Sequence, residues 1–317
     1  MSPQYSRVER MNYLSSKKLR VLAGAVAVAS CAVLAMPNAQ AAPAAVQAER
    51  PVPGVIDTPA NVPNAGRDAG WTAAKALAAV KNNKLYATGN IAASKCKRPA
   101  VALNTEKNVR YFESELVRCM YAAWKPNLWR MGARWDVKPA LVVHGYNTVN
   151  SACGSVTGWT SFYCSYRGGT IYIPWRQLVT YYAQNPTFAV AYATNTIAHE
   201  YGHHIQSMTG ILTASHWRGS HMTYDASLAE SRRRELQASC LGSAYIGANK
   251  AYYPMSGGLL TEWKWVVSHS GDQPGYPRDH GSWTNHNYWS LAGFTGNGKN
   301  THPGSCQTWS APATRIA

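Results

Sequence analysis

The chain has 317 residues, of which 46% are hydrophobic and 15% charged, and its formal net charge is +16. It contains no Cys-x-x-Cys spacing, which excludes zinc-finger modules, and no recognisable nucleic-acid-binding module, so we expect no nucleic-acid partner. The strong positive charge instead favours anionic surfaces, such as cell-wall polymers or membrane head groups.

The N-terminus has the pattern of an export signal. Residues 1–20 are polar and basic, residues 21–36 are almost entirely apolar, and Ala39-Gln40-Ala41 provides a small-residue cleavage site. An apolar run of this length is shorter than the roughly 20 residues that span a bilayer. We therefore predict a signal peptide over 1–41, cleavage near Ala41 and secretion. Alternatively, cleavage before Cys31 would leave a lipid-anchored protein.

Residues 42–70 are rich in alanine and proline without periodicity, which predicts a flexible spacer. Residues 71–317 are then expected to form one domain, without internal repeats and as a monomer. Removing the five basic residues and one acidic residue of 1–41 lowers the net charge from +16 to about +12.

Six cysteines remain after Cys31 is removed with the signal, and an even number in a secreted chain indicates disulfides. We predict the pairs Cys96–Cys119, Cys153–Cys164 and Cys240–Cys306.

Hydrophobic periodicity predicts the first elements of the domain. A short helix is expected over 71–82, and an amphipathic helix over Asn104–Lys125, which Pro126 would end. Residues 140–149 and 170–174 have the composition of strands.

The next helix carries a His-Glu-x-x-His motif at 199–203. Asn185 and Pro186 have the chemistry of a helix start, and Gly210 that of a stop. Residues four apart lie on one face of a helix, so His199 and His203 can hold one zinc ion. The carboxylate between them, Glu200, is placed to act as the general base toward a metal-bound water.

A third protein ligand is needed, and Glu235 is the main candidate. It lies within a second predicted helix, which a Ser227–Glu230 capping box would open and Gly247 would end. Spacing alone leaves four competing ligands open: Asp225, Glu230, His216 and His221. His204 points about 100° away from His203 and is not expected to be a ligand.

Several segments together resemble the putative neutral zinc metallopeptidase family of bacteria, over about 95–310. The segments that carry the resemblance are Ala198–Gln206, Glu235–Cys240, Cys153-Gly154 with Phe162-Tyr163-Cys164, Ile171–Ile173, His280-Gly281 and Ser305–Thr308. The resemblance implies that His199, His203 and Glu235 bind one Zn²⁺ per chain and that Glu200 is the base. Ser239 departs from the family pattern, which has aspartate there as a group that orients a ligand. We therefore expect a change in zinc affinity or in the efficiency of the chemistry.

Other features have two interpretations. Zinc peptidases of related architecture pair a strand with an extended substrate, and Thr170–Ile173 is our candidate for it. His280 or Tyr224 could stabilise an oxyanion, although the aromatic region 250–317 is more typical of packing beneath irregular loops. Arg232–Arg234 is interpreted as a solvated, partly ion-paired helix face.

These observations predict an α+β fold, a single zincin-like domain in which two central helices carry the metal site beside a small sheet. The predicted function is a secreted zinc metalloendopeptidase acting on peptide or protein substrates. The alternatives are a cell-surface binding protein that kept the fold with little or no turnover, and a zinc hydrolase of a non-peptide wall bond.

Overall fold

The computed structural model describes residues 70–317 except 274, 276 and 299. The predicted signal peptide, the alternative lipid site at Cys31 and the spacer lie outside these residues. All described residues belong to one compact unit. Within them, no helix is long and apolar enough to cross a membrane.

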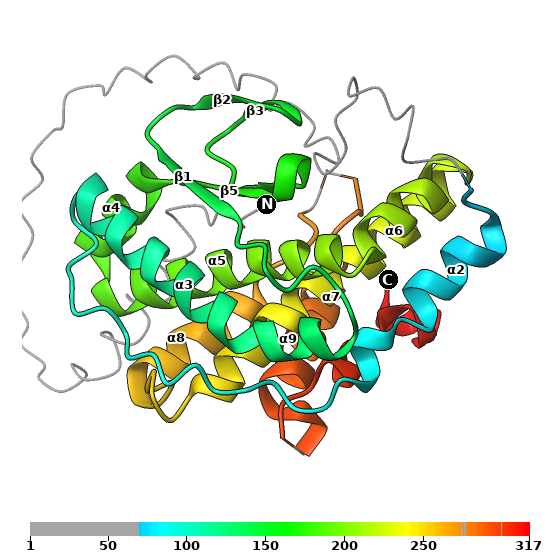
Figure 1. Cartoon of the computed structure of the whole chain (residues 1–317). Helices are drawn as coiled ribbons and strands as arrows, with labels where there is room; N and C mark the ends of the chain where they lie inside the picture. Colours follow the sequence, from blue (N-terminus) through cyan, green and yellow to red (C-terminus); the bar gives the residue numbers. More distant parts are fainter. Residues whose placement is uncertain (1–69, 274, 276, 299) are drawn as a thin grey trace, which may run out of the picture. The chain divides into compact units, whose positions relative to one another are not determined.

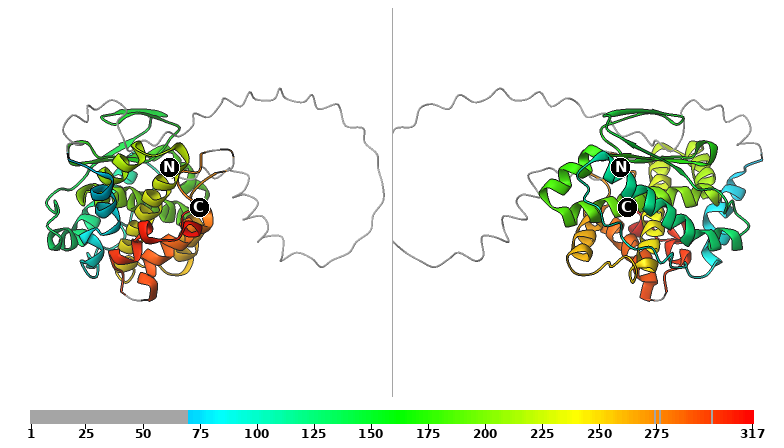
Figure 2. Two further views of the ribbon diagram at one scale, coloured as in Figure 1. Left: turned by 90° about the vertical axis from the view of Figure 1, so that its right-hand side faces the viewer. Right: turned by 60° about the vertical axis from the view of Figure 1, so that its left-hand side comes forward.

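The fold is α+β, with a large helical body and, on one side of it, a three-stranded sheet and a separate two-stranded sheet formed by β2 (Thr148–Ser151) and β3 (Gly154–Thr157) (Figures 1 and 2). The helices are α2 (Ala73–Lys81), α3 (Glu106–Arg130), α4 (Trp175–Gln184), α5 (Pro186–Met208), α6 (Ile211–Ser220), α7 (Tyr224–Asn249), α8 (Gly257–Ser268) and α9 (Trp283–Thr295). The strands of the three-stranded sheet are β1 (Ala140–His144), β4 (Phe162–Cys164) and β5 (Thr170–Pro174). Helix α5 is central, because it packs against α3, α4, α7 and α8, while α7 also packs on α9.

The start and end of α5 agree with the prediction. The Asn185 side chain accepts a hydrogen bond from the Phe188 amide, Pro186 occupies the first turn, and Gly210 follows the helix in the left-handed conformation. The apolar residues that recur along α5 at three- and four-residue steps are buried, but so is most of the rest of the helix. Helix α5 is therefore a core helix, and not one with a single packed face.

Helix α3 continues past Pro126, where we predicted its end. The extension is held by tertiary contacts that override the local signal. Trp124 and Leu128 are buried, and the Asn127 amide donates to Thr88 Oγ1 at 2.9 Å and to the Gly89 carbonyl at 3.2 Å. The short helix predicted over 71–82 is confirmed as α2.

Two predictions about the strands are wrong. The single strand expected over 140–149 is divided into β1 and β2, which belong to different sheets. Strand β5 forms as predicted, but it is central, with β1 parallel on one side and β4 antiparallel on the other. Residues 170–172 are therefore paired on both sides, so this strand is not the free edge that we expected to pair with an extended substrate.

Helix α7 begins and ends differently from the prediction. Its N-cap is Thr223, and the expected Ser227–Glu230 capping box does not form. The Glu230 carboxylate instead accepts hydrogen bonds from Arg218 Nε at 3.1 Å and Trp309 Nε1 at 2.8 Å. Gly247 does not end the helix but lies inside it, where an added Cβ would be 2.1 Å from the Phe294 carbonyl oxygen.

The C-terminal region is more regular than expected, because it contains α8 and α9 and not only irregular loops. The predicted aromatic packing is present, with Trp263 fully buried and Trp289 and Trp309 nearly so. The arginine run is also different from a solvated face. Arg234 is buried, and the guanidinium groups of Arg232 and Arg233 donate to backbone carbonyls of Arg278 and Thr308.

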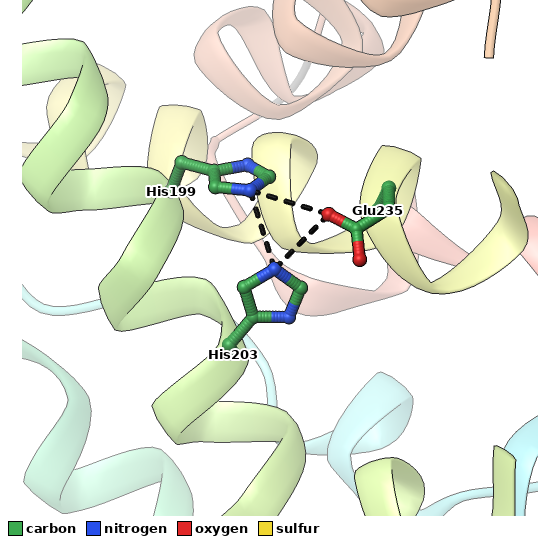
Figure 3. A group of neighbouring side chains, drawn as sticks. All are labelled: His199, His203 and Glu235. Carbon is green, nitrogen blue, oxygen red and sulfur yellow. Dashed lines mark hydrogen bonds and ion pairs between the residues drawn. The ribbon is translucent and has the colours of Figure 1, made fainter. Parts of the chain in front are cut away.

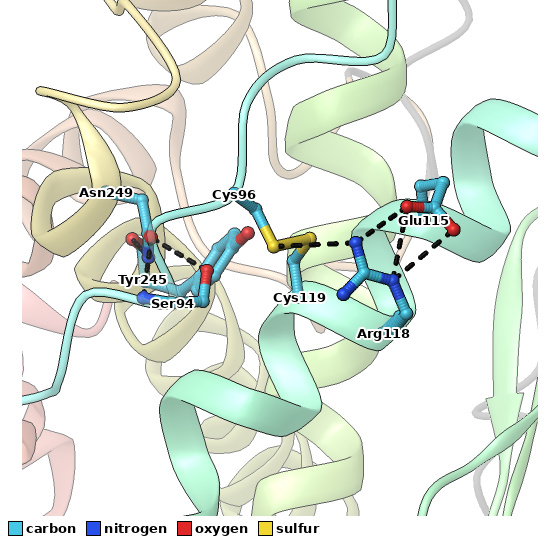
Figure 4. Close-up of a disulfide and its surroundings, with 7 residues drawn as sticks. All are labelled: Ser94, Cys96, Glu115, Arg118, Cys119, Tyr245 and Asn249. Atoms are coloured by element: carbon cyan, nitrogen blue, oxygen red, sulfur yellow. Dashed lines mark hydrogen bonds and ion pairs between the residues drawn. A yellow bond between two sulfur atoms is a disulfide. The ribbon is translucent and has the colours of Figure 1, made fainter.

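All three predicted disulfides are present: Cys96–Cys119, Cys153–Cys164 and Cys240–Cys306. Figure 4 shows how the first joins the segment before α3 to that helix. The same segment is fixed to the end of α7, because the Ser94 amide and hydroxyl both donate to Asn249 Oδ1 at 2.8 Å. Three disulfides are typical of a protein that matures in an oxidising compartment.

Candidate metal centre

Two glycines allow α5 and α7 to approach each other closely. A Cβ on Gly202 would lie 2.2 Å from the Ala238 carbonyl oxygen, and one on Gly242 would lie 2.4 Å from the Ala198 carbonyl oxygen. Real Cβ atoms need about 3.4 Å or more for ordinary contact. Backbone contact between the two helices is therefore possible only because both residues lack a side chain. It places the middle of α7 directly beside the His-Glu-x-x-His segment.

Three ligand atoms converge at this contact (Figure 3). Glu235 Oε2 lies 3.1 Å from His203 Nε2 and 3.4 Å from His199 Nε2, and the two imidazole nitrogens are 3.2 Å apart. The side chains are nearly buried, with exposed fractions of 12% for His199, 4% for His203 and 6% for Glu235. Of the candidate third ligands, Glu235 is the one that the fold brings to the histidine pair.

The spacing of these atoms fits a tetrahedral zinc ion. Nitrogen and carboxylate ligands bind zinc at about 2.0–2.1 Å, and two ligands at tetrahedral positions are then about 3.3 Å apart. The three observed separations, 3.1, 3.2 and 3.4 Å, lie around this value. Two imidazoles and one carboxylate are also the donor set of known catalytic zinc sites, with a further position left for water.

The far sides of both imidazoles are hydrogen-bonded, as metal-binding histidines require. His203 Nδ1 is 2.9 Å from Gln206 Oε1. The orientation of the Gln206 amide is fixed, because Gln206 Nε2 donates to the Arg234 carbonyl at 2.8 Å. His203 Nδ1 must therefore carry the proton, which leaves Nε2 with a lone pair. His199 Nδ1 is 2.8 Å from Ser239 Oγ. When both Nδ1 atoms are protonated, the two Nε2 atoms and Glu235 Oε2 are all acceptors and face one another. A cation between them would stabilise this arrangement.

The electrostatic surroundings favour the metal-binding forms of two of the ligands, the ionised carboxylate of Glu235 and the neutral imidazole of His199. Burial opposes ionisation of Glu235, but the neighbouring histidines outweigh it and hold the pKa of the carboxyl well below its ordinary value. Arg234 Nε also lies 3.6 Å from Glu235 Oε1, the carboxylate oxygen that faces away from the histidine pair. Burial lowers the pKa of His199 to about 3, so its imidazole is neutral at neutral pH.

His280 approaches the site from the loop before α9. Its Nε2 lies 3.8 Å from Glu235 Oε2, and its Nδ1 donates to Asp279 Oδ1 at 2.5 Å. Asp272 Oδ1 accepts from the His280 backbone amide at 2.8 Å and so fixes the same loop. Asp272, Asp279 and His280 form a second cluster of ligand-type atoms. Since the Nδ1 proton is shared with Asp279, we interpret this cluster as a support for His280.

The four competing candidates for the third ligand have other surroundings. Glu230 binds Arg218 and Trp309, and the exposed His221 stacks on Trp217 with ring centroids 4.1 Å apart. Asp225 is exposed, and burial near Arg234 lowers the pKa of His216 well below its ordinary value.

As expected, His204 faces elsewhere, with its ring nitrogens 3.1 Å from the Tyr163 hydroxyl and from the Val137 carbonyl. Glu200 lies beside His199 on α5 with 2% of its surface exposed, whereas Tyr224 is 68% exposed.

Apart from Ser239, sequence reasoning missed the residues that hold the ligands from behind. Gln206 could have been noticed, because it lies three residues after His203 on the same helix. Asp279 could also have been noticed, because it directly precedes His280, which was already a candidate. No sequence signal points to His286 of α9, whose ring centroid lies 6.4 Å from that of His199. Such contacts are made between distant segments and depend on the packing of whole helices.

The helical body and this two-helix site define a zinc-peptidase-like protein. The family model described as putative neutral zinc metallopeptidase matches residues 73–257, so the chain belongs to this family. The matched stretch includes His199, Glu200, His203, Glu235 and Ser239 and ends before His280 and α9. Comparisons with curated proteins and with solved structures find no match.

Proposed function

We propose that the protein is an exported zinc-dependent endopeptidase that cleaves peptide or protein substrates. The convergence of His199 Nε2, His203 Nε2 and Glu235 Oε2 at tetrahedral spacing carries this proposal. These residues would hold one Zn²⁺ per chain. Family membership supports the class of reaction, and the three disulfides support an oxidising location. The positive charge of the mature chain would favour anionic cell-wall or membrane surfaces.

The chain's own residues would supply the proton transfers. When bound, zinc would polarise the scissile carbonyl and acidify a water molecule. Glu200, adjacent to His199, would accept the proton of the attacking water and deliver it to the leaving amine. Burial of Glu200 at 2% exposure keeps bulk water away from this carboxylate and so strengthens its interactions with the reacting groups.

His280 is the best placed donor for the developing oxyanion. Its Nε2 faces the ligand cluster at 3.8 Å from Glu235 Oε2, and Asp279 holds the opposite nitrogen. An imidazolium in this position would donate from Nε2 while Asp279 balances its charge. Of the two donors considered from the sequence, His280 faces the ligand cluster, whereas Tyr224 is largely exposed.

A second candidate function is a binding protein that keeps the metal without turnover. The observation that favours it is the hydroxyl of Ser239, which stands behind His199 where a carboxylate would strengthen the ligand. Such a protein would bind zinc and peptide but release the peptide uncut.

A comparison of three proteins separates these functions. Wild type, Glu200→Gln and the control Glu106→Gln, whose carboxylate forms an exposed ion pair with Arg110, would be analysed for zinc content and for cleavage of an unfolded protein. The peptidase proposal expects about one zinc in each, chelator-sensitive cleavage by wild type and control, and a loss of at least about 100-fold in Glu200→Gln. Zinc binding without cleavage by wild type would favour the binding protein.

A further inference from the structure

The imidazole of His199 is held from behind by a chain of two side chains. His199 Nδ1 is 2.8 Å from Ser239 Oγ, and Ser239 Oγ is 3.4 Å from His286 Nδ1. Ser239 lies one helical turn after Glu235 on α7, so both side chains point to the same side of the helix. His286 comes from α9, and Ser239 and His286 are 7% and 6% exposed.

The direction of the hydrogen bonds follows from the use of His199 Nε2. If Nε2 provides a lone pair to the metal, Nδ1 must carry the proton and donate it to Ser239 Oγ. The Ser239 hydroxyl then has its own proton to donate. His286 Nδ1 is the nitrogen at hydrogen-bonding distance, so it accepts, and the His286 proton is on Nε2.

We propose that His286 is a positioning residue of the zinc site. By accepting the Ser239 proton, it turns the serine lone pairs toward His199 and fixes the imidazole that binds the metal. Without this acceptor the Ser239 hydroxyl could donate to His199 Nδ1, which would place the imidazole proton on Nε2 and block metal binding. The inference rests on the zinc site proposed above. It adds a residue that lies outside the stretch matched by the family.

The test is a double-mutant cycle with zinc affinity as its readout, measured by competition with a chromophoric chelator. Ser239→Ala removes the acceptor of the His199 proton and is expected to weaken zinc binding by about 10- to 100-fold. His286→Leu is expected to weaken it by about 3- to 10-fold, whereas His286→Asn keeps an acceptor and remains within about 2-fold of wild type. In the Ser239→Ala background, His286→Leu should have almost no further effect, because the two residues act in one chain.

A merely structural role for His286 predicts another pattern. His286→Leu would then lower the unfolding temperature and change zinc affinity equally with and without Ser239, or leave zinc affinity at the wild-type value. Either result overturns the proposal, provided that circular dichroism shows each variant folded without metal. Wild type that binds no zinc at micromolar concentration would instead overturn the zinc site itself, and this inference with it.

Discussion

Replacing Gly202 by alanine tests how the metal site is built. The new Cβ would lie 2.2 Å from the Ala238 carbonyl oxygen and 2.8 Å from its carbon, whereas ordinary contact begins near 3.4 Å. Helices α5 and α7 would therefore have to separate by about 1.2 Å, the difference between 3.4 and 2.2 Å. Overpacking of this kind costs about 1–3 kcal/mol, of which the better helix propensity of alanine offsets about 1 kcal/mol.

We expect the metal-free Gly202→Ala protein to lose up to about 2 kcal/mol of unfolding free energy, measured by urea titration. Ala238 lies between Glu235 and Ser239, so the same movement would draw the ligand and its neighbour away from His199. Zinc affinity, measured by chelator competition, is expected to fall at least about 10-fold.

Gly219→Ala is the matched control for this experiment. Gly219 lies in helix α6, and nothing is within 4 Å of its added Cβ, so this alanine should leave zinc binding unchanged and stabilise slightly. If Gly202→Ala retains wild-type zinc affinity, the close approach of α5 and α7 does not position the ligands.

Three further predictions concern single side chains. Glu235→Gln should weaken zinc binding by at least about 100-fold in chelator competition, while Glu115→Gln, which changes an exposed ion pair with Arg118, should not. Burial lowers the pKa of His204 to about 4, so between pH 6.5 and about 4 the unfolded chain binds a proton that folded His204 does not. Stability should therefore fall with acidification by up to about 3 kcal/mol in urea titrations, and His204→Asn should remove this part of the slope. Ser239→Asp should tighten zinc binding by about 10- to 100-fold, and an unchanged affinity in the same competition assay would contradict the role given to the hydroxyl.

The elements that could be predicted carry their signals locally. Helix α5 begins at Asn185 and Pro186 because a side-chain cap and a fixed backbone angle act within one turn. The pair His199 and His203 follows from helical spacing alone. For the same reason a metal-binding role for this pair could be proposed before its geometry was known.

The features that were missed depend on distant segments. Pro126 does not end α3 because Asn127 is held by Thr88 and Gly89, nearly 40 residues earlier. Glu230 does not cap α7 because Arg218 and Trp309 bind its carboxylate. Sequence spacing could not choose Glu235 over its competitors, since the choice depends on where α7 crosses α5.

The central claim is that His199, His203 and Glu235 bind one metal ion between them. A crystal structure of zinc-loaded protein, with anomalous data collected on both sides of the zinc absorption edge, tests this claim most directly. We predict one strong peak between the two Nε2 atoms and Glu235 Oε2, with the His199 and Glu235 side chains placed as described. A zinc peak at another cluster, or one at this site that Glu235 does not contact, would contradict it.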